Sequence, residues 1–239
     1  MMIENIKLVK SKKECCGCSA CMNICPKNAI SMKTDEYGFT YPKIDNKKCI
    51  KCGLCKRTCA YQNERKTYNI PQKIYAATTE NEDILLKSTS GGISGEICSK
   101  FINDNGIVYG CSIEKDDKNV IIPMHIRIDN KNELEKIQGS KYVKSQINFI
   151  YRNVRNDLLN DKKVLFTGTP CQIDALYSYL EMNDTDIKNL YTIDLICHGV
   201  PDTNIFQDYI KFIENKIYGK VQNFKFRDKK VGGGWDLRR

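Results

Sequence analysis

Two cysteine runs near the start of the chain constrain its fold more than any other feature. The first reads "CCGCSACMNICP" and the second "CIKCGLCKRTC", and each contains the spacing C-x-x-C-x-x-C-x-x-x-C. In this spacing three thiolates from one loop surround a cubane cluster, and the fourth cysteine of the run ligates the other cluster. The pattern predicts two 4Fe-4S clusters, one held by Cys15, Cys18, Cys21 and Cys59 and the other by Cys49, Cys52, Cys55 and Cys25.

Zinc is the alternative metal for these cysteines. Zinc sites draw thiolates in pairs from separate C-x-x-C motifs, whereas each run here supplies three cysteines plus one, so the spacing favours iron-sulfur clusters. Cys16 lies outside the pattern and is interpreted as a bystander thiol, and Ala60 stands where a second proline would be usual. The total of 13 cysteines is odd, which also indicates metal or redox chemistry rather than a disulfide framework.

The remainder of the first 66 residues fits a two-cluster ferredoxin-type domain. The stretch "AISMKTDEYGFTYPKID" between the runs alternates apolar residues around a turn and predicts a hairpin. These 66 residues carry 14 Lys and Arg against 6 Asp and Glu, whereas the remaining residues carry 24 against 23. This excess of positive charge would partly offset the negative charge of the clusters and would attract an acidic, ferredoxin-like electron donor. A nucleic-acid-binding module is disfavoured because no aromatic-studded basic groove is evident.

The start of the chain gives an expectation about location. The segment "MMIENIKLVKSKKE" lacks the apolar core of an export signal, and no stretch approaches the roughly 20 apolar residues of a membrane span. We therefore expect a cytoplasmic protein without a membrane span.

Residues 67–239 alternate strand and helix patterns after a polar linker that ends at Pro71. This order predicts a mixed α/β domain, so that the whole chain would be an α+β or α/β protein of two unequal domains, 1–66 and 67–239. The strands are expected at 73–79, 106–113, 120–128, 163–167, 190–196 and 221–226, and the helices at 92–104, 144–160, 170–182 and 203–217.

Short loops at strand ends and helix starts are the candidate sites of this second domain. "STSGG" at 88–92 could bind an anion or form an ordinary helix cap, and "GSKYVKS" at 139–145 could hold a phosphate or enter a helix in solvent. "TGTPCQ" places Cys171 in a first helical turn, where the dipole favours a reactive thiolate. "DLICHGVP" places Cys197 and His198 after the next strand. Both cysteines could equally be small buried hydrophobic residues.

The combination of a two-cluster start with "SGG", "GSKYV", "TGTPCQ", "CHGVP" and "FRDK" resembles the coenzyme F-420 hydrogenase/dehydrogenase beta-subunit family over essentially the whole chain. Members of that family are iron-sulfur flavoproteins, so the resemblance implies a flavin-binding domain and roles for Cys197 and His198 near the flavin. Family members usually continue beyond the equivalent of Trp235, so the flavin domain is expected to be truncated at its C-terminus. The FAD contacts that the resemblance implies are Ser90, Gly91, Gly92, Lys141, Thr169 and Gln172.

The main functional hypothesis is an iron-sulfur flavoprotein oxidoreductase. A ferredoxin-like donor would load the two clusters, and FAD would pass electrons to a two-electron acceptor such as a deazaflavin coenzyme or another substrate. Cys171, Cys197 and His198 are its candidate catalytic residues. The alternative is a non-catalytic electron-transfer subunit, or a fragment, that holds clusters without flavin and docks on a partner redox subunit.

Overall fold

The cysteine-rich segment folds around a two-stranded hairpin. A computed structural model describes residues 8–9, 12–63, 70–116 and 118–227. Strands β1 (Ile30–Thr34) and β2 (Thr40–Ile44) pair antiparallel, and Gly38 turns with a φ of 85°. The predicted hairpin is confirmed. The remaining elements of this N-terminal module are the 3-10 helix η1 (Lys12–Glu14) and the helices α1 (Ala20–Ile24) and α2 (Leu54–Arg57).

The second part of the chain is built on a four-stranded sheet with the order β4-β3-β5-β6. Strands β3 (Ile107–Lys115), β5 (Val164–Gly168) and β6 (Leu190–Asp194) run parallel, and β4 (Ile121–Ile128) lies antiparallel at the edge beside β3. The carboxyl ends of β5 and β6 therefore lie at the same edge of the sheet, and α/β proteins bind ligands at such edges.

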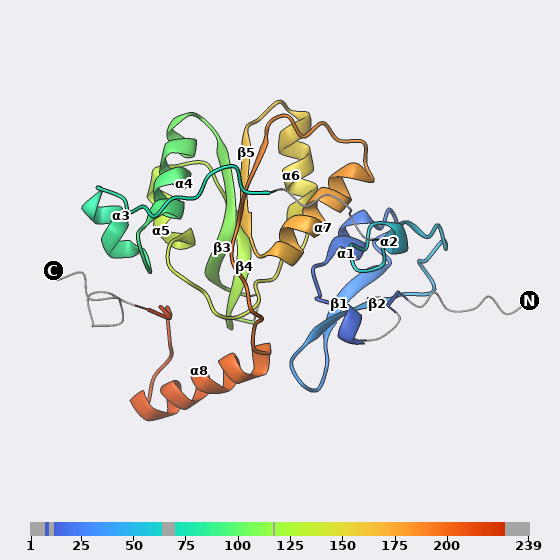
Figure 1. The fold of residues 1–239 in the computed structure, drawn as a ribbon. Coiled ribbons are helices and arrows are strands. Elements are labelled where there is room, and N and C mark those ends of the chain that lie inside the picture. The colour runs from blue at the N-terminus through green and yellow to red at the C-terminus, as the bar shows by residue number, and fades with distance from the viewer. Residues whose placement is uncertain (1–7, 10–11, 64–69, 117, 228–239) are drawn as a thin grey trace, which may run out of the picture.

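Helices cover both faces of this sheet (Figure 1). Val108 and Leu165 point to one face, where they pack with α4 (Ile93–Asn103). Their neighbours Tyr109 and Phe166 point to the other face, where they pack with α6 (Ile150–Leu159) and α7 (Pro170–Glu181). The period-two alternation of buried strands thus gives a three-layer α/β/α arrangement. The side of α4 also carries α3 (Glu82–Lys87), η2 (Lys131–Glu133) and α5 (Leu134–Ile137).

Helix α8 (Thr203–Ile217) lies at one end of the sheet (Figure 1). Asp202 caps it by accepting hydrogen bonds from the first backbone N–H groups, and Phe206 and Ile210 pack beside Ile121 and Val143. None of the helices in the described part of the chain has the length and apolarity needed to cross a bilayer.

Two predicted strands are wrong, and one predicted helix is shorter than expected. Residues 73–79 do not form a strand, and Ile74 and Tyr75 are largely exposed. Residues 221–226 pack their phenylalanine rings against α8 instead of joining a sheet. The helix expected at 144–160 begins only at Ile150, because Gln146 pairs with β4 through two backbone hydrogen bonds of 2.9 Å. The predicted boundary at residues 66 and 67 and the end of "FRDK" lie outside the described residues.

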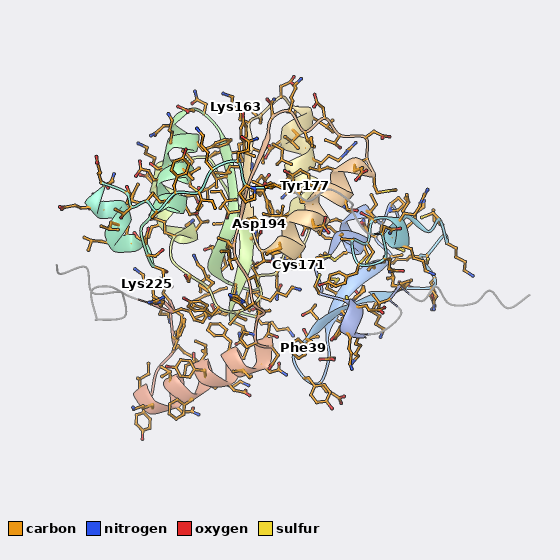
Figure 2. All side chains as sticks on the ribbon, viewed as in Figure 1. Phe39, Lys163, Cys171, Tyr177, Asp194 and Lys225 are labelled. Atoms are coloured by element: carbon orange, nitrogen blue, oxygen red, sulfur yellow. The ribbon has the colours of Figure 1, made fainter. Side chains whose placement is uncertain are left out.

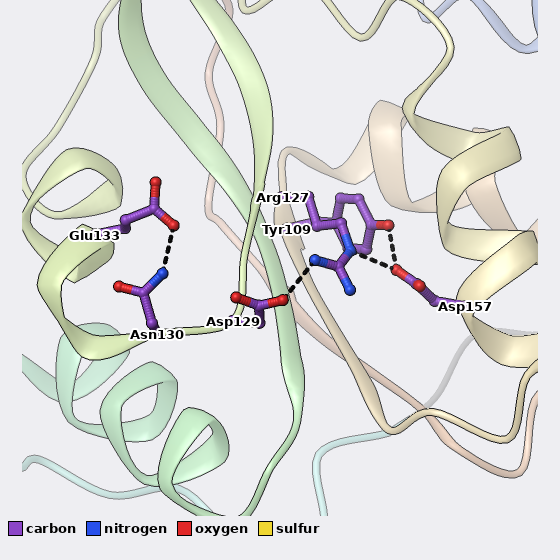
Figure 3. Close-up of polar contacts among 6 residues, drawn as sticks. All are labelled: Tyr109, Arg127, Asp129, Asn130, Glu133 and Asp157. Carbon is purple, nitrogen blue, oxygen red and sulfur yellow. Dashed lines mark hydrogen bonds and ion pairs between the residues drawn. The ribbon is translucent and has the colours of Figure 1, made fainter.

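A polar network ties β3 and β4 to α6 on the sheet face opposite α4 (Figure 3). The Tyr109 hydroxyl donates to the Asp157 carboxylate at 2.6 Å, and the Arg127 Nε donates to the same carboxylate at 2.9 Å. Arg127 also donates to Asp129 at 2.7 Å. Burial and the hydrogen bond to Asp157 raise the pKa of Tyr109, so this phenol remains a donor.

Candidate cluster and cofactor site

The two cysteine loops adopt the same backbone conformation at equivalent positions. Gly17 and Ser19 lie two and four residues after the first cysteine of the first run, and Lys51 and Gly53 hold the same positions in the second. All four have positive φ, between 58° and 75°. Left-handed residues alternating with others make the backbone N–H concavities that hold anionic groups such as iron-sulfur clusters. The repeat seen in the spacing is therefore also a repeat of backbone shape, and it fits cluster sulfides as acceptors.

The structure brings cysteines of the two runs close to one another. Burial raises the pKa of Cys21, and the neighbouring thiols of Cys15, Cys59 and Cys55 raise it further. Burial likewise raises the pKa of Cys55, with Cys52 and Cys25 among its neighbours. Cys21 of the first run thus lies near Cys59 and Cys55 of the second run, and Cys55 lies near Cys25 of the first. In the described ranges, no three His, Cys, Asp or Glu side chains converge on a single-ion site.

A cavity of about 2140 Å³ lies between the N-terminal module and the carboxyl edge of the sheet. Its wall includes Cys15 of the first cysteine loop and the tyrosines Tyr41 and Tyr61. It also includes every residue predicted outside the cluster loops: Ser90, Gly91, Gly92, Lys141, Thr169, Cys171, Gln172, Cys197 and His198. Four separate loops therefore meet at one space that reaches a cluster loop.

The "SGG" loop leads into α4 at the cavity wall. Its glycines are required by close packing, since a Cβ on Gly91 would lie 2.7 Å from the Ala77 carbonyl oxygen and a Cβ on Gly92 would lie 2.6 Å from the Thr79 side chain. Gly92 precedes α4 with a φ of 78° and offers no side-chain cap. The loop is thus more than an ordinary Ser or Thr cap, and the first backbone N–H groups of an 11-residue helix lie at the cavity.

Lys141 contacts its own loop. Its Nζ donates to the backbone carbonyls of Gln138 at 2.7 Å, Lys136 at 3.1 Å and Gly139 at 3.3 Å. Burial lowers its pKa to about 8. The ammonium therefore shapes the loop around Gly139 and adds positive charge to the cavity wall.

The "TGTPCQ" loop is fixed by a buried hydrogen-bond network. Gln172 Oε1 accepts from the backbone N–H and the hydroxyl of Thr169, both at 3.1 Å, while its Nε2 donates to Ser145 Oγ at 2.9 Å. Ser145 Oγ contacts His125 Nδ1 at 2.9 Å, and His125 Nε2 contacts the Thr167 carbonyl at 2.9 Å. Burial lowers the pKa of His125 to about 4, so the ring is neutral, with its proton on Nε2. Gln172 and Thr169 thus hold the shape of this wall.

Cys171 and Cys197 have different surroundings. Cys171 lies at the start of α7, where this helix approaches the N-terminal module, and its Sγ is 3.3 Å from Thr169 Oγ1 (Figure 2). The neighbouring Cys16 thiol and burial raise its pKa, in the direction opposite to the effect expected of the helix dipole. Cys197 is exposed, on a loop at the cavity mouth that it shares with His198.

Sequence reasoning missed Lys144 and the contact of Cys16. Lys144 lines the cavity, and a Cβ on Gly17 would lie 3.3 Å from its Nζ, so this cation sits against the first cysteine loop. Its position three residues after Lys141 in "GSKYVKS" was the available signal. Cys16 lies near enough to Cys171 to shift its pKa, a proximity that no local sequence pattern indicates.

Arg152 of α6 fixes the N-terminal module on the α/β part. Its guanidinium donates to the backbone carbonyls of Asn23 at 2.7 Å, Cys25 at 3.0 Å and Met22 at 3.2 Å, and to the Asn28 side chain at 2.8 Å. These carbonyls lie at the C-terminus of α1, which a cation stabilises. Apolar residues of α1 and β1 also join the core beneath α6 and α7. The cluster loops are thereby held beside the cavity.

Comparison with known proteins finds a match for each of the two parts of the chain. Residues 14–63 match the 4Fe-4S dicluster domain, and residues 161–235 match the family described as the C terminus of the coenzyme F420 hydrogenase/dehydrogenase beta subunit. An uncharacterized protein of Methanocaldococcus jannaschii is 26% identical over 203 residues, which cover 73% of this chain and 55% of that protein. The chain thus spans about half the length of this curated relative.

A solved structure of the F420-reducing [NiFe] hydrogenase complex from Methanosarcina barkeri is also similar. It matches with a TM-score of 0.45 and 20% identity, covering 58% of this chain and 48% of the other. The dicluster domain makes this chain an iron-sulfur protein of the electron-transfer class. The match at residues 161–235 relates the C-terminal part of the chain to the coenzyme F420 hydrogenase/dehydrogenase beta subunit.

Proposed function

We propose that this chain is an iron-sulfur flavoprotein oxidoreductase in which residues 1–66 carry two 4Fe-4S clusters and residues 67–239 bind FAD. Electrons enter from a ferredoxin-like donor or a partner redox subunit and leave to a two-electron acceptor, such as a deazaflavin coenzyme. The observation that carries the proposal is the shared wall of the cavity: Cys15, a proposed cluster ligand, lines the same space as all the proposed FAD contacts.

The cluster ligands we propose are the two crossed sets. Cys15, Cys21 and Cys59 are neighbours, as are Cys25, Cys52 and Cys55, which supports the exchange of the fourth ligand between the runs. Cys55 is near enough to Cys21 to raise its pKa, which supports short electron transfer between the two clusters. Cys18 and Cys49 complete the sets by their place in the spacing.

The cavity suits a dinucleotide and a second reactant. Its volume exceeds the roughly 300–1,000 Å³ of usual ligand pockets. The start of α4 at Ser90, Gly91 and Gly92 offers backbone N–H groups for phosphates, and Lys141 contributes positive charge to the same wall. FAD exchanges electrons singly or in pairs, so when bound it would connect one-electron clusters to a two-electron acceptor.

The remaining proposed site residues differ in role. Thr169 and Gln172 present a rigid loop edge, because their polar groups are bonded to each other and to the buried His125 network. Cys197 and His198 lie on the exposed loop at the cavity mouth, where a proton donor could reach an entering acceptor. Cys171 borders the cluster loop.

The test measures the contents of iron, acid-labile sulfide, zinc and released flavin in one sample of protein purified without oxygen. We expect the iron of two clusters and one FAD per chain. Gly91→Ala should lose FAD and keep iron, because the added Cβ would force the loop away from Ala77, whereas Gly219→Ala, whose Cβ would have 3.8 Å of room, should keep both. Zinc in place of iron would contradict the cluster assignment.

The electron path has its own variants. Cys25→Ser with Cys59→Ser removes the proposed fourth ligand of each cluster and should slow flavin reduction by ferredoxin without releasing FAD. Flavin reduction as fast as in the parent would refute the relay. Clusters without FAD, even after FAD is added, would instead identify a non-catalytic electron-transfer protein, which is the alternative function.

A further inference from the structure

The two cysteine runs repeat one spacing but lie in different surroundings. Met22 and Asn23, which follow the third ligand cysteine of the first run, are buried, with 7% and 2% of their surface exposed. Their equivalents in the second run are Lys56 and Arg57, and both are exposed. The same spacing therefore packs one run into the molecule and leaves the other at its surface.

The loop of the first run is enclosed by the rest of the chain. A Cβ on Gly17 would lie 2.5 Å from the Thr40 carbonyl oxygen and 3.3 Å from Lys144 Nζ. Ser19 is buried, and Cys15 lines the cavity. This first loop thus faces the cavity where we propose that FAD binds.

The loop of the second run is open. A Cβ on Gly53, the equivalent of Ser19, would meet no atom of the described residues within 4 Å. Cys52 is exposed, and Ile50 exposes 56% of its surface two residues before it. The proposed cluster of this loop would therefore lie close to the protein surface, where a carrier protein can approach it.

Positive charge accompanies this open loop. Its exposed cations are Lys47, Lys48, Lys51, Lys56 and Arg57. Within the described ranges, one carboxylate lies within ion-pair distance of any of them: the exposed Asp45, 3.9 Å from Lys48. Such cations attract an acidic partner, and the apolar Ile50 among them offers a contact that a purely solvated charged face would lack.

We propose that the second cysteine loop, formed by residues 47–57, is the docking surface for an acidic electron-carrier protein of the ferredoxin type. This inference rests on the proposed function, because it names the place where the electron donor binds. One electron passes in each encounter, so that the carrier is oxidised and this chain is reduced by one electron, and no bond is made or broken. The electron then moves from the open loop toward the first loop and the cavity.

The first measurement is the binding of oxidised plant-type ferredoxin, an acidic 2Fe-2S protein, to the cluster-loaded chain by isothermal titration calorimetry. The salt concentration is about 0.1 M, where charges more than roughly 10 Å apart are largely screened. Lys47→Glu with Lys56→Glu should raise the dissociation constant about tenfold or more, because local attraction becomes repulsion.

Lys162→Glu with Lys163→Glu is the matched control. It makes the same change in net charge, but it lies just before β5, at the amino end of that strand (Figure 2). We expect its dissociation constant to stay within about twofold of that of the parent, because screening confines the effect of these charges to their own surroundings.

The second measurement is the rate at which reduced ferredoxin bleaches the cluster absorption in stopped flow. Lys47→Glu with Lys56→Glu should be reduced about tenfold more slowly than the parent at low salt, and the difference should shrink as salt rises. Equal binding in this variant and the parent, or equal losses in the two double variants, would overturn the proposal. A dimer of the parent that Lys47→Glu with Lys56→Glu dissociates would assign the surface to a second copy and would also overturn it.

Iron and flavin contents separate this proposal from the proposed function. Weaker ferredoxin binding in a variant that keeps the iron, sulfide and FAD of the parent would support the docking surface. A parent chain without FAD would refute the flavoprotein and leave the docking surface standing, because neither measurement uses flavin. A parent chain without iron would refute the clusters and, with them, electron entry at this loop.

Discussion

Replacing Arg152 with alanine should undock the N-terminal module from the α/β part. The guanidinium makes four hydrogen bonds to α1 and the residues that follow it, and its carbon lies 4.7 Å from the centre of the Phe149 ring. Hydrogen bonds to a charged group contribute about 1.5–3 kcal/mol each. Because the side chain is partly solvated and one bond is exposed, we discount their sum and expect a loss of about 3–4 kcal/mol.

The assay is the rate at which cluster-loaded protein releases iron to a chelator under native conditions. If release requires transient opening of the α1 contact, each 1.4 kcal/mol raises the rate about tenfold. We therefore expect release from Arg152→Ala to be about 100-fold faster or more. The rate of iron release from Arg152→Lys should lie between those of the parent and Arg152→Ala, because lysine retains the charge and loses the planar guanidinium group.

Arg155→Ala is the matched control. Arg155 lies on the same helix and makes one side-chain hydrogen bond, from its Nε to Thr185 Oγ1 at 3.2 Å. Its removal should change iron release by less than about tenfold. Equal release rates from the two alanine variants would refute the reasoning that the Arg152 contacts hold the module in place.

Three further predictions concern stability and donor docking. Tyr109→Phe should lower the free energy of unfolding by about 1–2 kcal/mol in urea titrations, because Asp157 loses a 2.6 Å hydrogen bond; an unchanged midpoint would contradict this. The pKa of His125 falls from 6.5 to about 4 on folding, so its contribution is present above pH 6.5 and is lost as the pH falls toward 4. His125→Gln should therefore flatten the pH dependence of unfolding between these values, and identical profiles would exclude this role. Reduction by an acidic ferredoxin should slow as salt rises, because the first 66 residues carry 14 basic against 6 acidic side chains; a rate independent of salt would remove the docking idea.

The sequence predicted those elements whose signal is local. Cysteine spacing fixes loop shape directly, and the positive φ values at equivalent positions follow from it. β3 to β6 were found because their sequences are short, apolar runs bounded by turn residues, although β6 has no fully buried residue. Residues 73–79 carry the same apolar composition, yet no partner strand lies beside them in the described part of the chain. Composition alone does not reveal whether a neighbouring strand is available.

The site was predictable in its loops and not in its contacts between distant segments. The motifs around Gly91, Lys141 and Gln172 could be found because each adjoins a strand end or helix start. The proximity of Cys16 to Cys171 and the contacts of Arg152 depend on how α1 packs on α6 and α7. Such pairings are set by tertiary packing, which a single sequence does not encode at any one position.

The shared core has a consequence for biosynthesis. Asn23 donates a hydrogen bond to the Asn148 carbonyl and Ser178 donates one to the Thr58 carbonyl, so the module completes its packing with residues made more than 100 positions later. At translation rates of about 5–20 residues per second, the cysteine loops leave the ribosome roughly 6–24 seconds before α7 is available. We expect the thiols to be more accessible to iron and sulfide during that interval than after α6 and α7 have packed on the module.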